Sequence, residues 1–260
     1  GNKLSEDQVR DIIDGKSVIA PLREIQEVKN AMNTYELYSK LNPFSEKDLL
    51  KAHAVMMNSL TDDAGRFRHG GVGVFAGEKC VHLAPPATRV PFLIGDLFDW
   101  LKHSKDHLLI RSCVFHYEFE FIHPFSDGNG RMGRMWQTLL LMQWKPIFAW
   151  LPVETIVKEN QQKYYDAIAL SDKQGNSTAF ITFMLKCILA SLKEMCESNQ
   201  KSNQKVLSAI SENPDITIKE LQTLIGLSES GIKKILRQLR NDGVIVRIGG
   251  AKGGHWEILK

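Results

Sequence analysis

Cysteines are few in this sequence, and long apolar runs are missing from it. The four cysteines form no CxxC pair and no regular framework, which argues against a disulfide-stapled fold and favours reduced thiols. No run approaches the roughly twenty apolar residues of a membrane-spanning helix, and no signal-peptide pattern opens the chain. We therefore expect a globular, cytoplasmic protein without a membrane partner.

Neither sign of charge is in large excess, but charge is unevenly distributed. The 260 residues carry a formal net charge of +3, with 43% hydrophobic and 24% charged residues, as in ordinary globular proteins. Residues 201–260 hold ten Lys and Arg against six Asp and Glu, so the positive balance lies in the tail. This asymmetry predicts two domains, at residues 1–200 and 201–260, joined near the polar stretch at residues 197–203.

Helical periodicity dominates the first 200 residues. Apolar residues recur at intervals of three and four over residues 5–15, 22–35, 45–58, 90–103, 109–121, 132–143, 155–170 and 177–197. One glycine-rich stretch differs, because two β-prone runs at residues 72–75 and 80–83 flank a short turn and predict a hairpin. The expected fold class is mainly α, with one β-hairpin in the larger domain.

The tail combines helices with a small β-ribbon. One helix is expected at residues 204–212, a second after the capping residues Thr217 and Glu220, and then a basic helix. Two β-prone runs at residues 244–248 and 256–259 flank a glycine-rich turn. Three helices followed by a ribbon resemble a small winged helix-turn-helix domain.

One stretch, HPFSDGNGRMGR at residues 123–134, predicts the chemistry of the chain. A glycine loop that opens a helix leaves backbone N–H groups unpaired, and such groups bind anions. Arg131 and Arg134 are three residues apart, so they project from neighbouring helix positions toward further phosphate oxygens. Asp127 is a hard oxygen ligand for Mg²⁺, and His123 can accept a proton near neutral pH. Together these groups indicate chemistry on a phosphate ester.

This stretch closely resembles the core motif of the Fic family, HPFx(D/E)GNGRxxR, with every specified position filled. The alternative is a helix start whose glycines serve only the turn, but it leaves the histidine, the acid and both arginines unexplained. The resemblance covers residues 1–200 and implies a helical Fic domain in which the motif loop joins two central helices.

The resemblance implies a protein adenylyltransferase that moves AMP from ATP to a Ser, Thr or Tyr hydroxyl of a target protein and releases pyrophosphate. It implies that His123 is the catalytic base and that Asp127 holds Mg²⁺ between the phosphates. The nucleotide would be bound by the rest of the motif, namely Gly128, Asn129, Gly130, Arg131, Gly133 and Arg134. Transfer of this kind depends on positioning and electrostatic stabilisation.

Two further segments correspond to ligand-binding parts of Fic proteins. The hairpin at residues 72–83 resembles the Fic flap, whose edge strand pairs with the backbone of the target protein. The residues expected close to ATP or target are Val74, Phe75, Ala76 and Gly77. Tyr164 stands where many relatives place a tyrosine against adenine, although a tyrosine at helical spacing is more often a core residue. Three histidines without metal-ligand spacing receive no role: His53, His69 and His82.

The tail leaves a second function open. Four residues of the predicted basic helix are candidate contacts to DNA phosphates: Lys233, Lys234, Arg237 and Arg240. Such a helix can equally contact protein or form a solvated face. The alternative function is a DNA-binding regulator whose Fic-like domain binds nucleotide without turnover, and it leaves His123 without a task.

The opening residues lead to a regulatory expectation. Many Fic proteins restrain themselves with an inhibitory helix whose glutamate pairs with the second motif arginine. Residues 1–5 resemble the segment that follows this glutamate in relatives with an N-terminal copy. We therefore expect that glutamate to precede Gly1, and this form to bind ATP without the restraint on Arg134.

Overall fold

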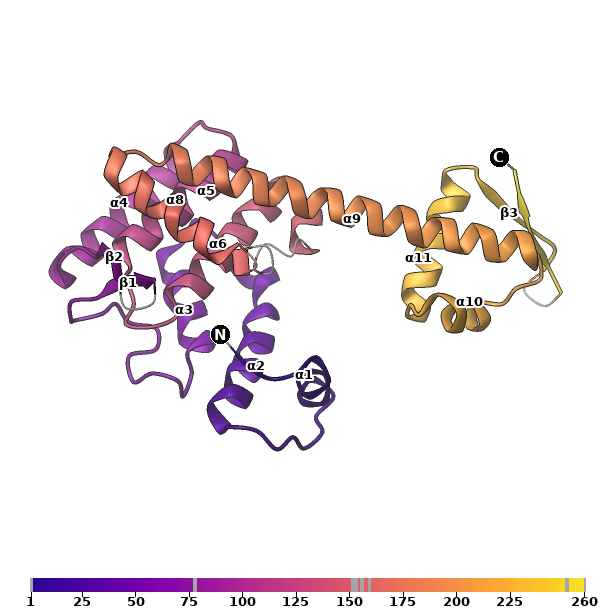
Figure 1. Cartoon of the computed structure of the whole chain (residues 1–260), viewed down its shortest axis with the longest axis horizontal. Helices are drawn as coiled ribbons and strands as arrows, with labels where there is room; N and C mark the ends of the chain where they lie inside the picture. The colour runs from indigo at the N-terminus through magenta and orange to yellow at the C-terminus, as the bar shows by residue number, and fades with distance from the viewer. Residues whose placement is uncertain are drawn as a thin grey trace. The chain divides into compact units, whose positions relative to one another are not determined.

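The computed structural model describes residues 2–76, 79–150, 154, 157, 158, 160–250 and 253–259. The chain divides into two units, Gly1–Leu189 and Ala190–Lys260, and the division falls within the long helix α9 (Thr178–Glu212). The predicted boundary at residue 200 lies within the same helix. Figure 1 shows the elements of each unit in chain order.

The first unit is mainly helical, as predicted. Besides the start of α9, its α-helices are α1 (Glu6–Ile13), α2 (Leu22–Tyr35), α3 (Glu46–Met56), α4 (Val90–His103), α5 (Leu108–Ile122), α6 (Asn129–Trp144) and α8 (Gln161–Gln174). Short 3-10 helices are η1 (Tyr38–Lys40), η2 (Ala87–Arg89) and η3 (Pro146–Trp150). The predicted capping box begins α1, because Ser5 accepts a hydrogen bond from the Gln8 N–H.

Helices α5 and α6 pack against each other at the centre of the first unit. The contact between them is more extensive than that between any other two described elements. Trp136 of α6 is fully buried, and its Nε1 donates to the Pro43 carbonyl oxygen at 3.0 Å. Phe98 of α4 meets Phe115 of α5 edge-on, with ring centroids 5.5 Å apart. The motif loop joins α5 to α6, so this core holds both ends of the loop.

The glycine-rich stretch forms the predicted antiparallel hairpin. β1 (Gly73–Ala76) pairs with β2 (Lys79–Leu83), and a bulge opposite Val74 and Phe75 places one extra residue in β2. The Ala84 N–H donates to the Val72 carbonyl oxygen at 3.2 Å and closes the base of the hairpin. The turn at residues 77 and 78 lies outside the described residues, and with it the predicted contact of Gly77.

One predicted break does not occur. The polar stretch at residues 197–203, expected as a helix end or linker, continues α9 without interruption to Glu212. The stretch contains neither proline nor glycine, and most of its residues are exposed, so ordinary helix propensity suffices to continue the helix. The lack of apolar residues marks solvent exposure here, not the end of the helix.

The second unit has its own core. The last turns of α9 precede α10 (Ile218–Ile225), α11 (Glu229–Asn241) and an antiparallel ribbon of β3 (Ile245–Ile248) and β4 (His255–Ile258). Thr217 caps α10 in the predicted capping box, and Ser228 caps α11. The buried cluster joins helices and ribbon through Val206, Ile210, Leu221, Ile232, Leu236, Leu239, Ile245 and Trp256. Three helices and a ribbon in this order form a winged helix-turn-helix arrangement.

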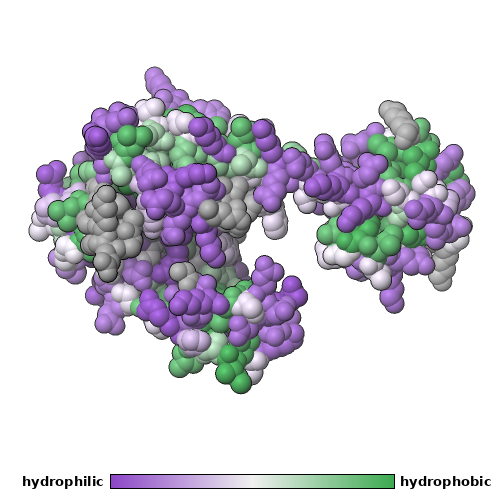
Figure 2. Space-filling model, in the orientation of Figure 1, coloured by the Kyte–Doolittle hydropathy of each residue, from purple (hydrophilic) through white to green (hydrophobic). Residues whose placement is uncertain are grey.

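The visible surface is mainly hydrophilic, with scattered hydrophobic patches (Figure 2). Exposed large apolar side chains include Ile13, Ile19 and Leu22, in and between α1 and α2. None of the helices in the described part of the chain combines the length and the apolar character that crossing a membrane requires.

Candidate active site

His123 has an unusual backbone conformation at the end of α5. Its φ of 50° and ψ of 62° lie in the left-handed region, which costs a non-glycine residue about 1–2 kcal/mol. The His123 N–H donates to the Phe119 carbonyl oxygen at 2.9 Å, so the residue caps the helix. Its side chain is 16% exposed. The imidazole therefore stands at the edge of the core, where the motif loop begins.

Side-chain hydrogen bonds hold the loop after His123. Asn129 is 3% exposed, and its side chain accepts from the Phe125 N–H at 2.9 Å and donates to the Phe125 carbonyl oxygen at 2.8 Å. Ser126 Oγ donates to Asp63 Oδ1 at 2.7 Å. The motif asparagine therefore shapes the loop with its side chain and can offer only its backbone amide to a ligand.

His53, for which the sequence predicts no role, holds the backbone of Asp127. The Gly65 N–H donates to His53 Nδ1 at 2.9 Å, so the ring proton lies on Nε2, which donates to the Asp127 carbonyl oxygen at 3.0 Å. The ring stacks on Phe125, with centroids 3.6 Å apart. Burial lowers the pKa of His53 and favours this neutral form.

The start of α6 has no side-chain cap. Gly128 is the N-cap residue, with φ of 86°, and a β-carbon there would lie 2.8 Å from Met57 Sδ. Both the backbone angle and the available space therefore require glycine. Since the first N–H groups of an α-helix have no intrahelical partner, the amides of Asn129 and Gly130 can bind an anion.

Asp127 and Arg131 lie beside these amides in an ion-pair network with α2. Arg131 Nη2 lies 3.3 Å from Asp127 Oδ1, and Arg23 Nη2 lies 3.2 Å from Asp127 Oδ2. Arg131 Nη1 lies 3.8 Å from Glu27 Oε1. The side chains of Asp127 and Arg131 remain 47% and 33% exposed, so both are accessible to a ligand.

The surroundings of Asp127 fit Mg²⁺ only together with a phosphate ligand. Within the described residues, no group of three or more His, Cys, Asp and Glu side chains could hold a metal ion. Mg²⁺ binds through one or two carboxylates, several waters and substrate phosphates, and a single half-exposed carboxylate meets that need. Asp127 Oδ1 also accepts from the Gly128 N–H at 2.6 Å, which holds the carboxylate against the loop.

A buried polar cluster lies beneath the motif. His116 Nδ1 lies 2.7 Å from Gln137 Oε1, and His116 Nε2 lies 3.3 Å from the Tyr164 hydroxyl. Burial lowers the pKa of His116 to about 4 and raises that of Glu120 to about 7. The positive charge of Arg134 lowers the pKa of Glu120 and partly offsets its burial. At neutral pH the histidine is therefore uncharged, and the acid keeps its proton more readily than an exposed carboxyl group does.

Gly133 allows α6 to pack closely on this cluster. A β-carbon at Gly133 would lie 3.0 Å from His116 Cδ2 and 3.1 Å from Glu120 Oε1. One helical turn earlier, a β-carbon at Gly130 would lie 3.0 Å from Arg134 Nη1, so this arginine reaches back toward the loop. Gly133 thus faces the cluster below the motif.

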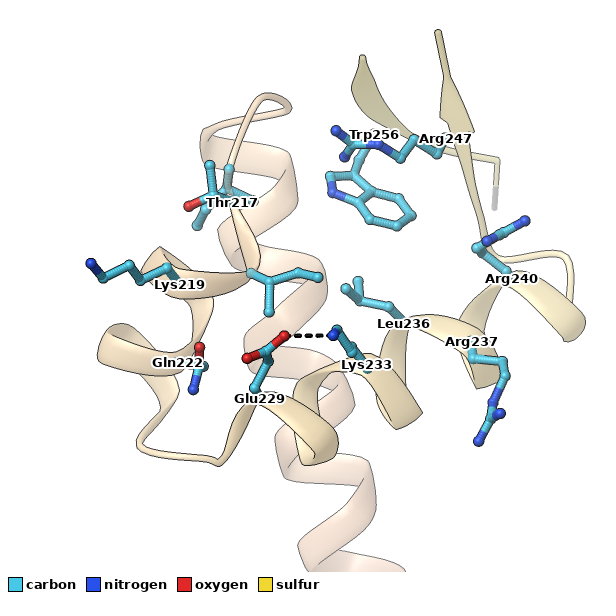
Figure 3. Close-up of a pocket in the computed structure, with 12 residues that line it drawn as sticks. Thr217, Lys219, Gln222, Glu229, Lys233, Leu236, Arg237, Arg240, Arg247 and Trp256 are labelled. Atoms are coloured by element: carbon cyan, nitrogen blue, oxygen red, sulfur yellow. Dashed lines mark ion pairs between the residues drawn. The ribbon is translucent and has the colours of Figure 1, made fainter. Parts of the chain in front are cut away.

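A cavity in the second unit is lined by several cationic side chains and by Trp256 (Figure 3). Its cationic lining residues are Lys219, Lys233, Arg237, Arg240 and Arg247. The Arg247 guanidinium lies over the Trp256 ring, 4.9 Å from its centroid. Lys233 pairs with Glu229 at 2.5 Å, and Lys234 is not among the lining residues. The cavity therefore includes three of the four basic residues that the sequence predicts for DNA.

Both units of this chain match known protein families. Residues 43–141 match the family model described as Fic/DOC family, and residues 200–246 match one described as winged helix-turn-helix DNA-binding. The crystal structure of a Fic family protein from Desulfovibrio desulfuricans G20 is 42% identical and covers 99% of this chain and 82% of that chain, with a TM-score of 0.74. The chain belongs to the Fic family.

Other Fic relatives are more distant. Protein adenylyltransferase Fic of Culex quinquefasciatus is 31% identical over 199 residues, which are 72% of this chain and 37% of that protein. Protein adenylyltransferase fic-1 of Caenorhabditis briggsae is 29% identical over 234 residues, which are 85% of this chain and 43% of that protein. This chain thus spans about two fifths of these curated relatives. The structure of Fic-1 (aa134 - 508) from C. elegans, at 24% identity and a TM-score of 0.61, shares the fold over 78% of this chain and 60% of that chain.

In this Fic-family chain, the predicted site residues fall into two layers. His123, Asp127 and Arg131 lie in the motif loop or at its ends, with the uncapped amides of α6 beside them. Gly133 and Tyr164 lie in the buried layer below, where Tyr164 is only 5% exposed, and their contacts with nucleotide stay predictions. Side chains of the hairpin at residues 74–82 are outside the described part, so those of Val74, Phe75 and Ala76 stay predictions too.

Sequence reasoning missed four polar residues that support the site: Arg23, His53, Arg68 and Glu120. The first three come from segments far from the motif along the chain, and no local pattern identifies their partners. A signal did exist for Glu120, because it precedes His123 by three residues on one helical face.

Proposed function

We propose that this Fic-family protein is a protein adenylyltransferase, which transfers AMP from ATP to a Ser, Thr or Tyr hydroxyl of a target protein and releases pyrophosphate. The observation that carries the proposal is the combination of an imidazole, an uncapped helix start and two arginines within residues 123–134. The names of the Culex and Caenorhabditis relatives support the same activity.

His123 is the proposed base. Its Nδ1 lies 3.3 Å from the Glu120 carbonyl oxygen, and the tautomer that donates to this oxygen keeps the lone pair on Nε2. The target hydroxyl oxygen attacks the α-phosphorus while its proton passes to Nε2. The bond from the α-phosphorus to the oxygen shared with the β-phosphate breaks, and pyrophosphate leaves with that oxygen. AMP remains bound to the target as a phosphate ester.

The phosphates would bind at the start of α6. The amides of Asn129 and Gly130 donate to phosphate oxygens, and Arg131 and Arg134 offset the charge that develops on the leaving group. Asp127 would hold Mg²⁺, which when bound neutralises phosphate charge. These groups sit on a loop and a helix that the core already holds, so little reorganisation accompanies the reaction.

The target segment would add to the β1–β2 hairpin. An extended peptide can pair with an open strand edge through main-chain hydrogen bonds, whatever its side chains. The hairpin at residues 73–83 would then present the hydroxyl to His123. Tyr164 remains the proposed contact for adenine.

Labelled ATP provides the test. Wild-type protein with cell extract as acceptor should label protein from α-labelled ATP and not from γ-labelled ATP. Folded His123→Ala protein should lose this labelling, whereas His69→Ala should keep it, because His69 is an exposed histidine outside the motif. Label from γ only would establish kinase-like chemistry instead, and full labelling by His123→Ala would remove the histidine from its assigned role.

A second candidate function is duplex DNA binding by the second unit. The specific observation is the cavity of Figure 3, where five cationic side chains from α10, α11 and the ribbon line one concavity. Each phosphate contact that releases a counterion contributes about 0.9 to the slope of log affinity against log salt. Arg237→Ala should therefore lower that slope by about one. Lys234→Ala is the matched control, since this exposed lysine on α11 does not line the cavity.

These measurements also separate the enzyme from the regulator. A regulator that only senses nucleotide would bind DNA with a nucleotide-dependent affinity and label no protein. An enzyme whose tail locates it on DNA would do both. Binding without a salt-dependent slope, or no binding at all, would overturn DNA recognition through phosphate contacts.

A further inference from the structure

Arg68 joins three segments of the first unit through one buried guanidinium. The residue is 2% exposed. Its Nε donates to the His123 carbonyl oxygen at 2.7 Å, and its Nη1 donates to that of Gly70 at 2.7 Å. Its Nη2 donates to the carbonyl oxygens of Pro85 at 2.6 Å and Ile122 at 3.2 Å. The acceptors come from the end of α5 and from both sides of the hairpin.

The backbone of Arg68 makes a further contact with the motif. Its N–H donates to the Pro124 carbonyl oxygen at 2.9 Å, so side chain and backbone bind consecutive residues of the loop start. The His123 carbonyl belongs to a residue in a left-handed conformation, which persists only when surrounding contacts hold it. Arg68 supplies two such contacts, one to the His123 carbonyl oxygen and one to the next carbonyl oxygen, that of Pro124.

The positive charge of Arg68 is stabilised by the dipoles of backbone carbonyl groups. Carbonyl groups at the end of α5 carry the negative end of the helix dipole, and two of the four acceptors lie there. Burial lowers the pKa of Arg68, yet the planar group still satisfies four carbonyls at once. A lysine could carry the charge, but its compact ammonium has three donors and cannot span the same acceptors.

Gly70 and Pro85 stand just outside the two strands of the hairpin. Between them, the Ala84 N–H donates to the Val72 carbonyl oxygen, and Gly73 pairs with Leu83. Arg68 therefore connects the segments that flank β1 and β2 to the backbone of His123. The loop that leads into α6 is held separately, by the Asn129 side chain at Phe125 and by His53 at Asp127.

We propose that Arg68 is a positioning residue that sets the hairpin against His123, and so aligns the target hydroxyl with the base. This inference rests on the proposed adenylyltransferase function. Because the phosphate site has its own supports, Arg68 should govern the target-dependent step and not ATP binding. A misplacement of about 1 Å can lower the rate of an aligned reaction roughly 100-fold.

Arg68→Lys tests the proposal while keeping the charge. We expect kcat for a protein target to fall roughly 10- to 100-fold, with the Kd for ATP by calorimetry changed less than about twofold. Amides of β1 and β2 should exchange hydrogen faster, because the hairpin loses its anchor. Arg66→Lys is the matched control, since Arg66 is an exposed arginine two residues away and should change none of these quantities.

A smaller variant covers the case in which Arg68→Lys does not fold. Arg68→Ala, assayed with and without added guanidinium ion, should regain transfer and hairpin protection as the ion fills the space. If folded Arg68→Ala protein recovers neither AMP transfer nor hairpin protection when guanidinium is added, the proposal is overturned.

The outcomes also distinguish the two hypotheses. Wild-type transfer of AMP with Arg68→Lys at full kcat and unchanged hairpin exchange would overturn the inference alone. Loss of ATP binding in step with loss of transfer would reduce Arg68 to a structural role. A wild-type protein that transfers no AMP would overturn the proposed function and this inference with it.

Discussion

Replacing Glu120 with glutamine should change how the stability of the first unit depends on pH. The carboxyl group is 4% exposed, and its Oε1 has no hydrogen-bond partner within the described part of the chain. Burial raises its pKa from 4.5 to about 7, although Arg134 and the Tyr164 hydroxyl lower it in part. Between pH 4.5 and 7 the folded state therefore holds a proton that the unfolded state has lost.

The contribution of Glu120 to the free energy of unfolding is fully present below pH 4.5. It falls as the pH rises toward 7, because the unfolded state releases the proton that the folded state keeps. One pH unit corresponds to about 1.4 kcal/mol, so the full window amounts to roughly 3 kcal/mol. His116 acts in the opposite direction, because burial lowers its pKa to about 4 and its contribution grows between pH 4 and 6.5. The two effects therefore oppose each other in the wild type, and in Glu120→Gln only the effect of the histidine remains.

The assay is urea unfolding followed by tryptophan fluorescence, in a Trp256→Phe background where every remaining tryptophan lies in the first unit. The free energy of unfolding of Glu120→Gln, relative to its parent, should rise by roughly 3 kcal/mol between pH 4.5 and 7.5. Glu6→Gln, an exposed acid of α1, is the control and should show no such rise. A difference that stays constant with pH, or that falls, would show that burial does not raise the pKa of the Glu120 carboxyl group.

Three further changes test the packing. Gly133→Ala forces a β-carbon to 3.0 Å from the His116 ring, so urea unfolding should show a loss of about 1–3 kcal/mol; an unchanged midpoint would contradict the close packing of α5 on α6. Trp136→Phe removes the hydrogen bond to Pro43 and leaves a buried carbonyl unpaired, which should cost about 1–3 kcal/mol in the same assay. Leu221→Ala empties a fully buried site, and the amides of α10 and α11 should lose about 2–5 kcal/mol of hydrogen-exchange protection while those of α5 keep theirs.

Local patterns were sufficient for most of the fold. The Ser5–Gln8 and Thr217–Glu220 capping boxes mark helix starts, and both form as predicted, because the capping hydrogen bonds involve residues three apart. The hairpin and the winged arrangement follow from runs and turns of the same short range. The stretch at residues 197–203 shows the limit, since polarity alone does not distinguish an exposed helix from a linker.

The candidate site divides in the same way. Residues 123–134 are contiguous, so their types and spacing already predict an anion site with a base, a metal ligand and two arginines. The structure adds groups from elsewhere: Arg23 beside Asp127, His53 on the loop backbone and Arg68 at the hairpin. Each of these is a polar residue in a segment that looks like ordinary surface or loop in the sequence.

The order of residues along the chain specifies which chemistry it can offer, because a helix start, its glycines and its charged residues interact over a few positions. The groups that support this chemistry come together through the packing of distant segments. Burial raises the pKa of Glu120, and the packing of chain segments more than fifty residues apart brings Arg68 to His123. Desolvation and long-range hydrogen bonds depend on which segments pack together, and that information is not contained in any short stretch of the chain.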